Sequence, residues 1–175
     1  MTDVTDLGSA PVPELSVDDH VRGPLDSPLV IEYADFECPF CGALQAKLAG
    51  RRLRRAFRHF PVRTSHPRAW PAACAAEAAG LQGHFWEMHD LLFADQARLE
   101  DPHLWERARA LELDLERFDV DRRSDAVRAR VARDFQSGLR GGVVTTPTIF
   151  TTTGVHAGRV QEAVLDALGE RVRFR

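Results

Sequence analysis

The chain has 175 residues and a mass of 19.6 kDa, the length of one domain that can bury a core without disulfides or metals. Hydrophobic residues make up 44% and charged residues 28%, with 12 Gly and 10 Pro, which excludes collagen-like, low-complexity and largely disordered proteins. The formal net charge of -3 and the pI near 6.2 provide no overall field that attracts polyanions. We expect no nucleic-acid partner and no membrane partner.

The N-terminal region and the cysteine content bear on the compartment. The first 21 residues contain no Lys or Arg and no apolar run of the length of a secretory signal. No apolar run elsewhere approaches the roughly 20 residues of a membrane-spanning helix. Three cysteines are too few for a secreted disulfide framework, and one of them must be unpaired. We therefore expect a cytoplasmic protein.

The first 62 residues predict a tail followed by a βαβ unit. Residues 1–27 mix Pro, Ser, Gly and Asp without periodicity, which is typical of a loose tail. Residues 29–36 (LVIEYADF) are rich in β-formers and bounded by prolines, which indicates a buried central strand. Apolar residues at helical spacing over 39–55 predict a helix, and 56–62 (AFRHFPV) predict a second strand.

The rest of the chain predicts a helical segment and then a return to strand chemistry. Helices are expected from Ser65 or Pro67, over 84–93, from Asp101, and from Ser124 to Gly141. The run TTPTIFTT at 145–152 predicts a strand, followed by a turn at Gly154 and a closing helix. The order indicates an α/β fold whose core comprises residues 28–64 and 141–175, with residues 65–140 as an inserted helical subdomain.

The motif Cys38-Pro39-Phe40-Cys41 follows the first strand and opens a helix. At a helix N-terminus, free backbone N–H groups and the positive end of the helix dipole stabilise a thiolate, so Cys38 is predicted to attack. Cys41 lies one turn later on the same face and is predicted to resolve the mixed disulfide. Pro39 suits the first helical turn because its missing N–H would be unpaired there.

Two other interpretations of the cysteines remain open. A structural zinc site needs four ligands, and the further candidates near in sequence are Cys74, His59 and His66. The second alternative is that both motif cysteines serve as small apolar packing residues. Cys74 lies among alanines in a predicted helix, where we expect a buried and inert thiol. Redox chemistry without a metal or organic cofactor is the favoured interpretation.

Four segments carry a family resemblance. They are DHVRGPLDSPLVIEYADFECPFCG (19–42), FRHFPV, HPRAWPAACAAEAAGLQGHFWEMHDLLF (66–93) and VVTTPTIF (143–150). From about residue 18 to its end, the chain resembles the DsbA-like branch of thioredoxin-fold thiol:disulfide oxidoreductases. Three features coincide in order: Cys-Pro-x-Cys after a strand, a helical insertion, and a Thr-Pro that opens a late strand. The resemblance implies a thioredoxin fold with an inserted helical subdomain.

The resemblance also implies roles for residues outside the motif. Pro147 would be a cis-proline facing the cysteines, and the backbone of Thr146 would pair with an extended substrate; an edge-strand trans-proline is the alternative. Glu32 would be a buried acid beneath the cysteine pair. Desolvation should raise its pKa and let it exchange protons with Cys41. The alternatives are a solvent-facing or salt-bridged Glu32.

Other residues around the motif lead to further expectations. The pair between the cysteines lacks the His of strongly oxidising relatives, so the resemblance implies a less oxidising couple. Phe40, if exposed, offers an apolar contact to substrate, and Glu37 should oppose thiolate formation unless it points to water. The arginines of residues 51–58 are expected on a solvated face.

The sequence thus predicts a thiol:disulfide oxidoreductase acting on protein or peptide substrates, with redox equivalents supplied by an unidentified thiol system. In a reducing cytoplasm the reductase or isomerase direction is favoured. The alternatives are a chaperone or binding module whose cysteines sense oxidation, and a glutathione-linked enzyme acting on small molecules, against which Cys41 argues.

Overall fold

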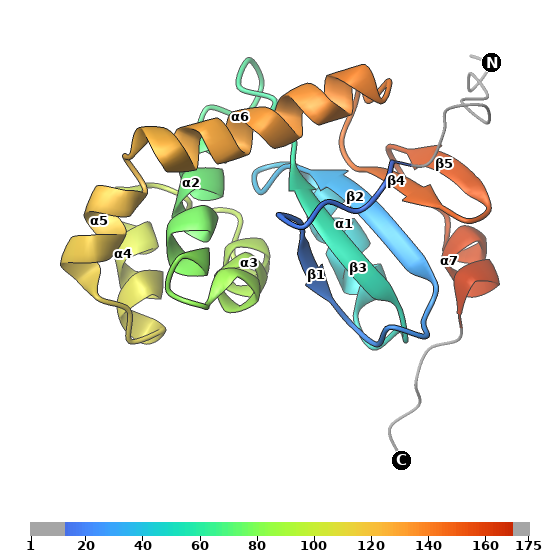
Figure 1. Cartoon of the computed structure of the whole chain (residues 1–175), viewed down its shortest axis with the longest axis horizontal. Coiled ribbons are helices and arrows are strands. Elements are labelled where there is room, and N and C mark those ends of the chain that lie inside the picture. The colour runs from blue at the N-terminus through green and yellow to red at the C-terminus, as the bar shows by residue number, and fades with distance from the viewer. Residues whose placement is uncertain (1–12, 170–175) are drawn as a thin grey trace.

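A five-stranded mixed sheet forms the centre of the molecule (Figure 1). The structure is a computed structural model that describes residues 13–169. The strands, in spatial order, are β1 (His20–Arg22), β3 (Arg54–His59), β2 (Leu29–Ala34), β4 (Thr148–Thr151) and β5 (Gly154–Ala157). The pair β2 and β3 is parallel, and the other neighbouring pairs are antiparallel. The expected central strand is confirmed, since β2 has two strands on each side.

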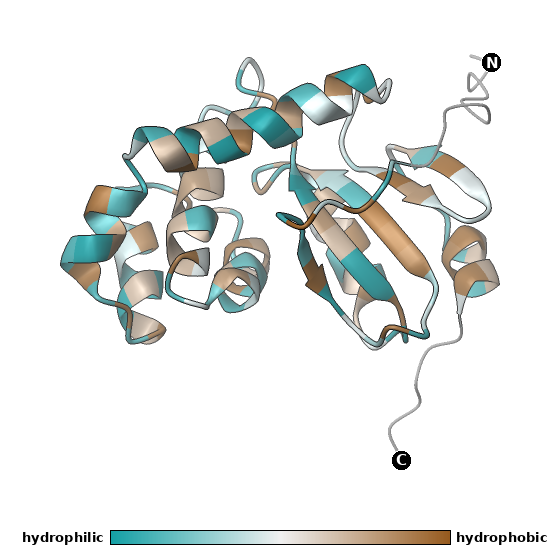
Figure 2. Ribbon diagram, in the orientation of Figure 1, coloured by the Kyte–Doolittle hydropathy of each residue, from teal (hydrophilic) through white to brown (hydrophobic). Residues whose placement is uncertain are grey.

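Helices cover one face of this sheet and the end of the other (Figure 1). α1 (Pro39–Leu48) and α7 (Glu162–Leu168) pack on one face through a cluster that includes Val30, Leu44 and Leu165. α6 (Asp125–Arg140) crosses the end of the other face (Figure 1), where Tyr33 and Phe60 belong to a second cluster. Figure 2 shows β2 as a largely hydrophobic strand. A strand that is covered on both faces needs apolar side chains on both, which is why its apolar run is nearly continuous.

The inserted segment is helical, as predicted, and shares its core with the sheet. It comprises α2 (Ala69–Gly80), α3 (Phe85–Ala94), α4 (Asp101–Ala110), α5 (Leu115–Asp121) and α6. One hydrophobic cluster joins Phe36, Phe57 and both motif cysteines to side chains of these helices. Of these helices, α5 was not predicted from the sequence. The Asp114 side chain caps it by accepting from Arg117 N at 3.0 Å. The described residues include no helix long and apolar enough to cross a membrane.

The expected loose tail over residues 1–27 is wrong at its end, because residues 20–22 form strand β1. Residues 1–12 of that tail and residues 170–175 of the expected core lie outside the described residues. β1 pairs with the edge of β3, with His20 opposite Phe57. His20 Nε2 also lies 2.9 Å from Glu77 Oε1, and the buried Asp19 carboxylate pairs with Arg58 at 2.7 Å. A strand of three residues is too short to produce a periodic sequence signal.

The expected solvated arginine face is wrong for three of its five members, since Arg52 is exposed and Arg54 is half-buried. Arg51, Arg55 and Arg58 are all buried, with 6 to 8% of their surface exposed. Arg55 pairs with Glu32 at 2.9 Å and Arg58 with Asp19 at 2.7 Å, while Arg51 pairs with carboxylates of α7. Buried charges persist in proteins when they are paired and hydrogen-bonded, and each of these guanidinium groups meets that condition.

The ends of two expected strands also differ. β3 begins at Arg54 and ends at His59, before Pro61, which has no N–H to donate. The run at 145–152 forms a strand only from Thr148 onward, and Gly154 begins β5 instead of making the turn. The turn falls at 152–153, where the Thr151 hydroxyl accepts from Thr153 N at 3.1 Å.

The close approach of α6 to the sheet depends on Gly138. A Cβ at this position would lie 2.7 Å from Phe60 Cδ2 and 2.9 Å from Tyr33 Cδ1. We expect Gly138→Ala to lower the free energy of unfolding by about 1–3 kcal/mol, because the overlap outweighs the gain in helix propensity. Urea unfolding tests this, with Gln136→Ala on the exposed side of α6 as the control. A stabilised Gly138→Ala protein would contradict this packing.

Candidate active site at the start of helix α1

Cys38 is the N-cap of α1 and Pro39 occupies the first helical turn. β2 ends at Ala34, and a short loop leads directly to Cys38. The Cys38 carbonyl oxygen accepts from Cys41 N at 3.1 Å and from Gly42 N at 3.2 Å, which closes the first turn. The predicted placement of the motif at a strand end and a helix start is thus what the structure shows.

The late Thr-Pro segment lies against the first cysteine. Cys38 Sγ is 3.4 Å from the carbonyl oxygen of Thr146, although 108 residues separate them. The Thr146–Pro147 peptide bond is cis, as the resemblance implies. Both motif cysteines are free thiols, with 3% of Cys38 and none of Cys41 exposed. The loop before β4 therefore brings Thr146 to the predicted nucleophile.

The two thiols differ strongly in acidity. Hydrogen bonding from the Cys41 thiol lowers the pKa of Cys38 to about 5 against the opposing effect of burial, and the Thr146 side chain and the backbone N–H groups of Phe40 and Cys41 contribute further. Burial raises the pKa of Cys41 well above its usual value, and hydrogen bonding and charge repulsion from Cys38 add to the increase. At neutral pH one sulfur is a thiolate, and its neighbour stays protonated.

Glu32 is fully buried, as expected, but its predicted acidity is wrong. Burial alone would raise its pKa, yet the Arg55 guanidinium and the nearby His89 outweigh that effect and lower the pKa to about 2. Arg55 Nη2 donates to Glu32 Oε2 at 2.9 Å, and Gln45 Nε2 donates to Oε1 at 2.8 Å. The salt-bridged alternative is therefore correct. An acid so strongly held as a carboxylate does not exchange protons near neutral pH.

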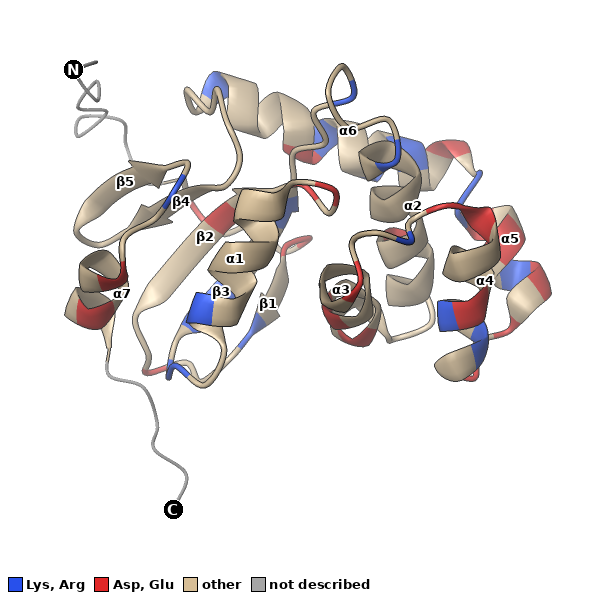
Figure 3. Cartoon of the chain, turned by 180° about the vertical axis from the view of Figure 1, so that it is seen from behind, with Lys and Arg blue, Asp and Glu red and all other residues tan. Residues whose placement is uncertain are grey.

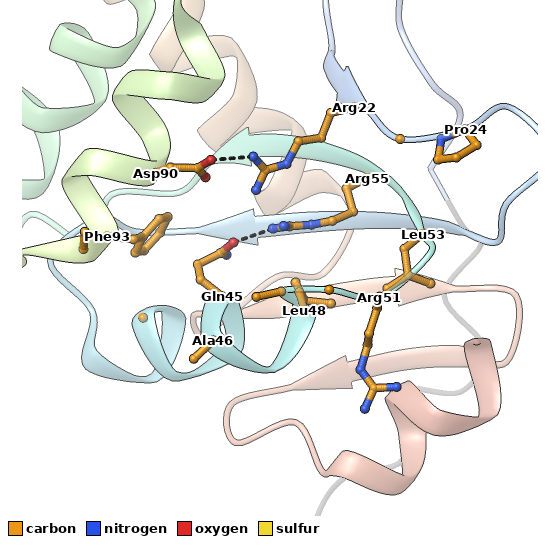
Figure 4. Close-up of a pocket in the computed structure, with 15 residues that line it drawn as sticks. Arg22, Pro24, Gln45, Ala46, Leu48, Arg51, Leu53, Arg55, Asp90 and Phe93 are labelled. Atoms are coloured by element: carbon orange, nitrogen blue, oxygen red, sulfur yellow. Dashed lines mark hydrogen bonds and ion pairs between the residues drawn. The ribbon is translucent and has the colours of Figure 1, made fainter. Parts of the chain in front are cut away.

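A pocket of about 590 Å³ opens between α1 and α3 beside this ion pair (Figure 4). Its lining includes Arg55 and Gln45, the two residues that hold Glu32. Arg22 and Asp90 form an ion pair at 2.8 Å on its wall. Arg55 and Gln45 face the pocket, whereas Glu32 itself is fully buried.

The two acids nearest to Cys38 have partners. Asp35 is buried; its carboxylate accepts from Val62 N and lies within 2.8 Å of His66 Nδ1, and its backbone N donates to Cys41 Sγ at 3.4 Å. Glu37 does not point freely to water, because Arg68 donates to it from its backbone N at 2.7 Å and from Nε at 2.9 Å. The Arg68 charge offsets the repulsion of the thiolate expected from Glu37.

Phe40 lies on the open side of the motif with 44% of its surface exposed. Its ring is 5.4 Å from the Arg159 guanidinium. Beside it lies a mostly apolar pocket of about 370 Å³, lined by residues of α1 together with Arg159 and Val160. Figure 3 shows that α1 carries little charge, with Lys47 as its one charged residue. This surface next to Cys38 suits an apolar side chain of a bound peptide.

The remaining candidate ligands lie elsewhere. Cys74 is buried in α2, and burial raises its pKa to about 11, which makes it a poor nucleophile. Within residues 13–169, the side chains that gather within 4.8 Å as a potential metal site are His59, Glu77 and Asp134, without a cysteine. Arg130 is already paired with Asp134 there.

Three residues of the site were not predicted from the sequence. Arg55 belongs to a basic run whose expected position was the surface, and Gln96 belongs to a polar loop between helices. Gln96 Nε2 donates to the carbonyl oxygens of Phe36 and Cys38 at 2.8 and 2.9 Å. Gly42 lies against the same amide. A single Gln, Gly or Arg carries no periodic signal, so the contacts across the fold were needed to find them.

The low pKa of Cys38 predicts a pH profile for its alkylation. With reduced protein carrying Cys74→Ala, the iodoacetamide rate should follow the thiolate fraction, with a midpoint near pH 5 and a plateau by neutral pH. A Cys38→Ser variant is the control, because the Cys41 thiol that it leaves should react slowly. A midpoint near the usual thiol value, above pH 8, would contradict the hydrogen-bonding arrangement.

The Arg55 and Glu32 pair predicts a charge-dependent stability. Arg55→Met should lower the free energy of unfolding by about 3–5 kcal/mol at pH 7, because it leaves a buried carboxylate without its partner. The pair stabilises the fold above the unfolded pKa of Glu32 and loses this contribution as the pH falls toward 2. The deficit of Arg55→Met in urea unfolding should therefore shrink in acid. Adding Glu32→Gln to Arg55→Met should restore most of the lost free energy of unfolding at pH 7. A double variant as unstable as Arg55→Met would show that an unpaired Glu32 carboxylate is not the cause of the loss.

Comparison with known proteins identifies the family. A family model described as thioredoxin matches residues 15–168. The sodium/proton antiporter NhaA 3 of Salinispora tropica is 46% identical over 160 residues, covering 85% of this chain and 24% of the antiporter. NhaA 1 of Mycolicibacterium vanbaalenii is 46% identical over 149 residues, covering 80% of this chain and 24% of that protein. The chain spans about a quarter of the length of the curated relatives it matches.

Solved structures show the same fold. A thioredoxin-like oxidoreductase from Silicibacter pomeroyi has a TM-score of 0.77 at 24% identity, covering 87% of this chain and 91% of that one. The thiol-disulfide exchange protein α-DsbA2 of Wolbachia pipientis has a TM-score of 0.75 at 16% identity, covering 86% of this chain and 85% of the other. The fold is that of these DsbA-like structures, and the match to residues 15–168 places the chain in the thioredoxin family.

Proposed function

We propose that this protein catalyses thiol–disulfide exchange on protein or peptide substrates. The observation that carries the proposal is the asymmetric cysteine pair: a Cys38 thiolate with a pKa of about 5 at a helix start, next to a protonated Cys41 and the Thr146–Pro147 loop. Such a pair separates a nucleophile from a resolving thiol. The thioredoxin family and the DsbA-like fold support exchange chemistry.

The proposed reaction has two displacements. The Cys38 thiolate attacks one sulfur of a substrate disulfide; a bond to Cys38 Sγ forms, the substrate S–S bond breaks, and the released thiolate takes up a proton. Cys41 then loses its proton and attacks Cys38 Sγ, which releases the second substrate sulfur as a thiolate. The substrate gains two electrons, and Cys38–Cys41 becomes a disulfide. The Thr146 backbone, beside Cys38, is suited to hydrogen-bond an extended peptide during these steps.

The direction we propose is isomerisation or reduction in the cytoplasm. The thiolate stabilises the reduced form of the pair, so a low Cys38 pKa raises the reduction potential. A reducing glutathione pool then keeps the pair as a dithiol, which is the form that attacks misplaced disulfides. Of the two activities, the low pKa favours isomerisation, because a strongly stabilised dithiol is a weak reductant. A thiol redox partner would reset the pair after net reduction.

The curated relatives add a candidate partner. Their antiporter names describe proteins of which this chain matches about a quarter, and that quarter corresponds to a thioredoxin-family domain. We propose a membrane antiporter as one candidate protein substrate, which departs from the expectation of no membrane partner. A Cys41→Ser variant retains the attacking thiol but lacks the resolving one, so it should accumulate mixed disulfides with its substrates, whereas a Cys38→Ser control should not.

The redox equilibrium of Cys38 and Cys41 in glutathione buffers tests the proposed function, with Cys74→Ala removing the third thiol. We expect a potential of roughly -180 mV, as for protein disulfide isomerase, and therefore less oxidising than DsbA at roughly -120 mV. Cys38→Ser should abolish turnover on a scrambled disulfide substrate. If the Cys38→Ser protein suppressed aggregation as well as the parent, and the parent had no exchange activity, the binding-module alternative would replace this proposal. A potential below about -230 mV would retain exchange but overturn the isomerase direction.

A further inference from the structure

A side chain from the helical insertion reaches the backbone of the active-site loop. Gln96 lies between α3 and α4, yet its Nε2 donates to Phe36 O at 2.8 Å and to Cys38 O at 2.9 Å. An amide nitrogen has two hydrogens, and these two contacts use both of them. Gln96 therefore joins the loop after β2 to a segment 58 residues later in the chain.

The Cys38 carbonyl that Gln96 binds also closes the first turn of α1. It accepts from Cys41 N at 3.1 Å and Gly42 N at 3.2 Å. Donors from the helix on one side and from Gln96 on the other therefore fix its position. The orientation of this turn determines where the N–H groups of Phe40 and Cys41 point, and those groups contribute to stabilising the Cys38 thiolate. A shift of the Cys38 carbonyl would thus alter the hydrogen bonds at its own sulfur.

The segment that carries Gln96 is itself held on both sides. Arg107 has 9% of its surface exposed and donates to Asp95 O at 2.9 Å and Arg98 O at 2.7 Å. On the other side, Arg68 donates from Nη1 to Ala97 O at 2.9 Å. Since backbone carbonyls on both sides of Gln96 are bound, its amide is presented to Cys38 from a rigid support.

Gly42 provides the space for this amide. A Cβ at Gly42 would lie 2.2 Å from Gln96 Oε1 and 2.9 Å from Cδ, and the nearest atoms around that position all belong to Gln96. Glycine is unfavourable inside a helix relative to alanine, so its presence in α1 has a local cost. The close approach of Gln96 accounts for that cost.

We propose that Gln96 is a positioning residue for the nucleophile, with Gly42 as the gap in α1 that admits it. Gln96 fixes the Cys38 carbonyl and so keeps the first turn of α1 aimed at the Cys38 sulfur. The effect of Gln96 on thiol–disulfide exchange rests on the proposed function. Titration of the Cys38 thiolate requires no substrate, so failure of exchange and failure of positioning are distinguishable.

The first test is the pH titration of the Cys38 thiolate by ultraviolet absorbance in a Cys74→Ala background. Gln96→Ala should raise the Cys38 pKa by about half a unit or more, the size expected when the displaced turn costs the Cys38 sulfur one net hydrogen bond. Gln96→Met keeps the size of the side chain but has no hydrogen-bond donor, so it should raise the Cys38 pKa as Gln96→Ala does. Gln82→Ala is the matched control, because Gln82 clamps Asp114 through two hydrogen bonds in the same helical region, away from the cysteines. An unchanged pKa in a folded Gln96 variant overturns the proposal.

The second test is a double-mutant cycle between Gly42 and Gln96. Gly42→Ala should displace the Gln96 amide and raise the Cys38 pKa as Gln96→Ala does. In the Gln96→Ala background the same change should add no further shift and should raise the urea midpoint, since the overlap is gone and alanine favours the helix. Two shifts that simply add would show that the residues act independently and would overturn the proposal.

Discussion

The site depends on one constraint, which is that Cys38 must hold a negative charge although only 3% of its surface is exposed. Desolvation opposes an ion in that position, so the charge must be met by donors at fixed places. The Cys41 thiol, the Thr146 side chain and the first-turn N–H groups of α1 are those donors. They come from a helix start and from a loop more than a hundred residues later, so the acidity of one sulfur depends on the whole sheet being assembled.

The carboxylates around the cysteines are neutralised individually. Glu32 is paired with Arg55, and Glu37 with Arg68. Without Arg68, the Glu37 charge next to Cys38 in the sequence would raise the Cys38 pKa, and without Arg55 the buried Glu32 would tend to hold a proton. The pairing fixes Glu32 as a carboxylate, and at neutral pH the hydrogen-bonded sulfur pair holds a single proton, on Cys41.

The helical insertion is part of the site. Its helices share a hydrophobic cluster with Phe36 and both motif cysteines, so the cysteines are buried partly by residues of the insertion. Arg68 and Gln96 extend from the same region to the loop that precedes α1. Cys38, Phe40 and the apolar pocket beside Phe40 lie together at the start of α1, where an extended peptide would meet them.

What the sequence by itself determined is local in character. A β-rich run, a Cys-Pro-Phe-Cys motif at a helix start and a late Thr-Pro identify the central strand, the nucleophile and the loop that faces it, because each signal lies within a few neighbouring residues. The tertiary structure decided the partners. Whether Glu32 is a proton carrier or a fixed carboxylate depends on Arg55 in the adjacent strand, and the roles of His20, Gln96 and Gly42 appear only when distant segments meet. Periodicity reports which face of an element is buried, whereas charge pairing and hydrogen bonding depend on which atoms lie opposite that face.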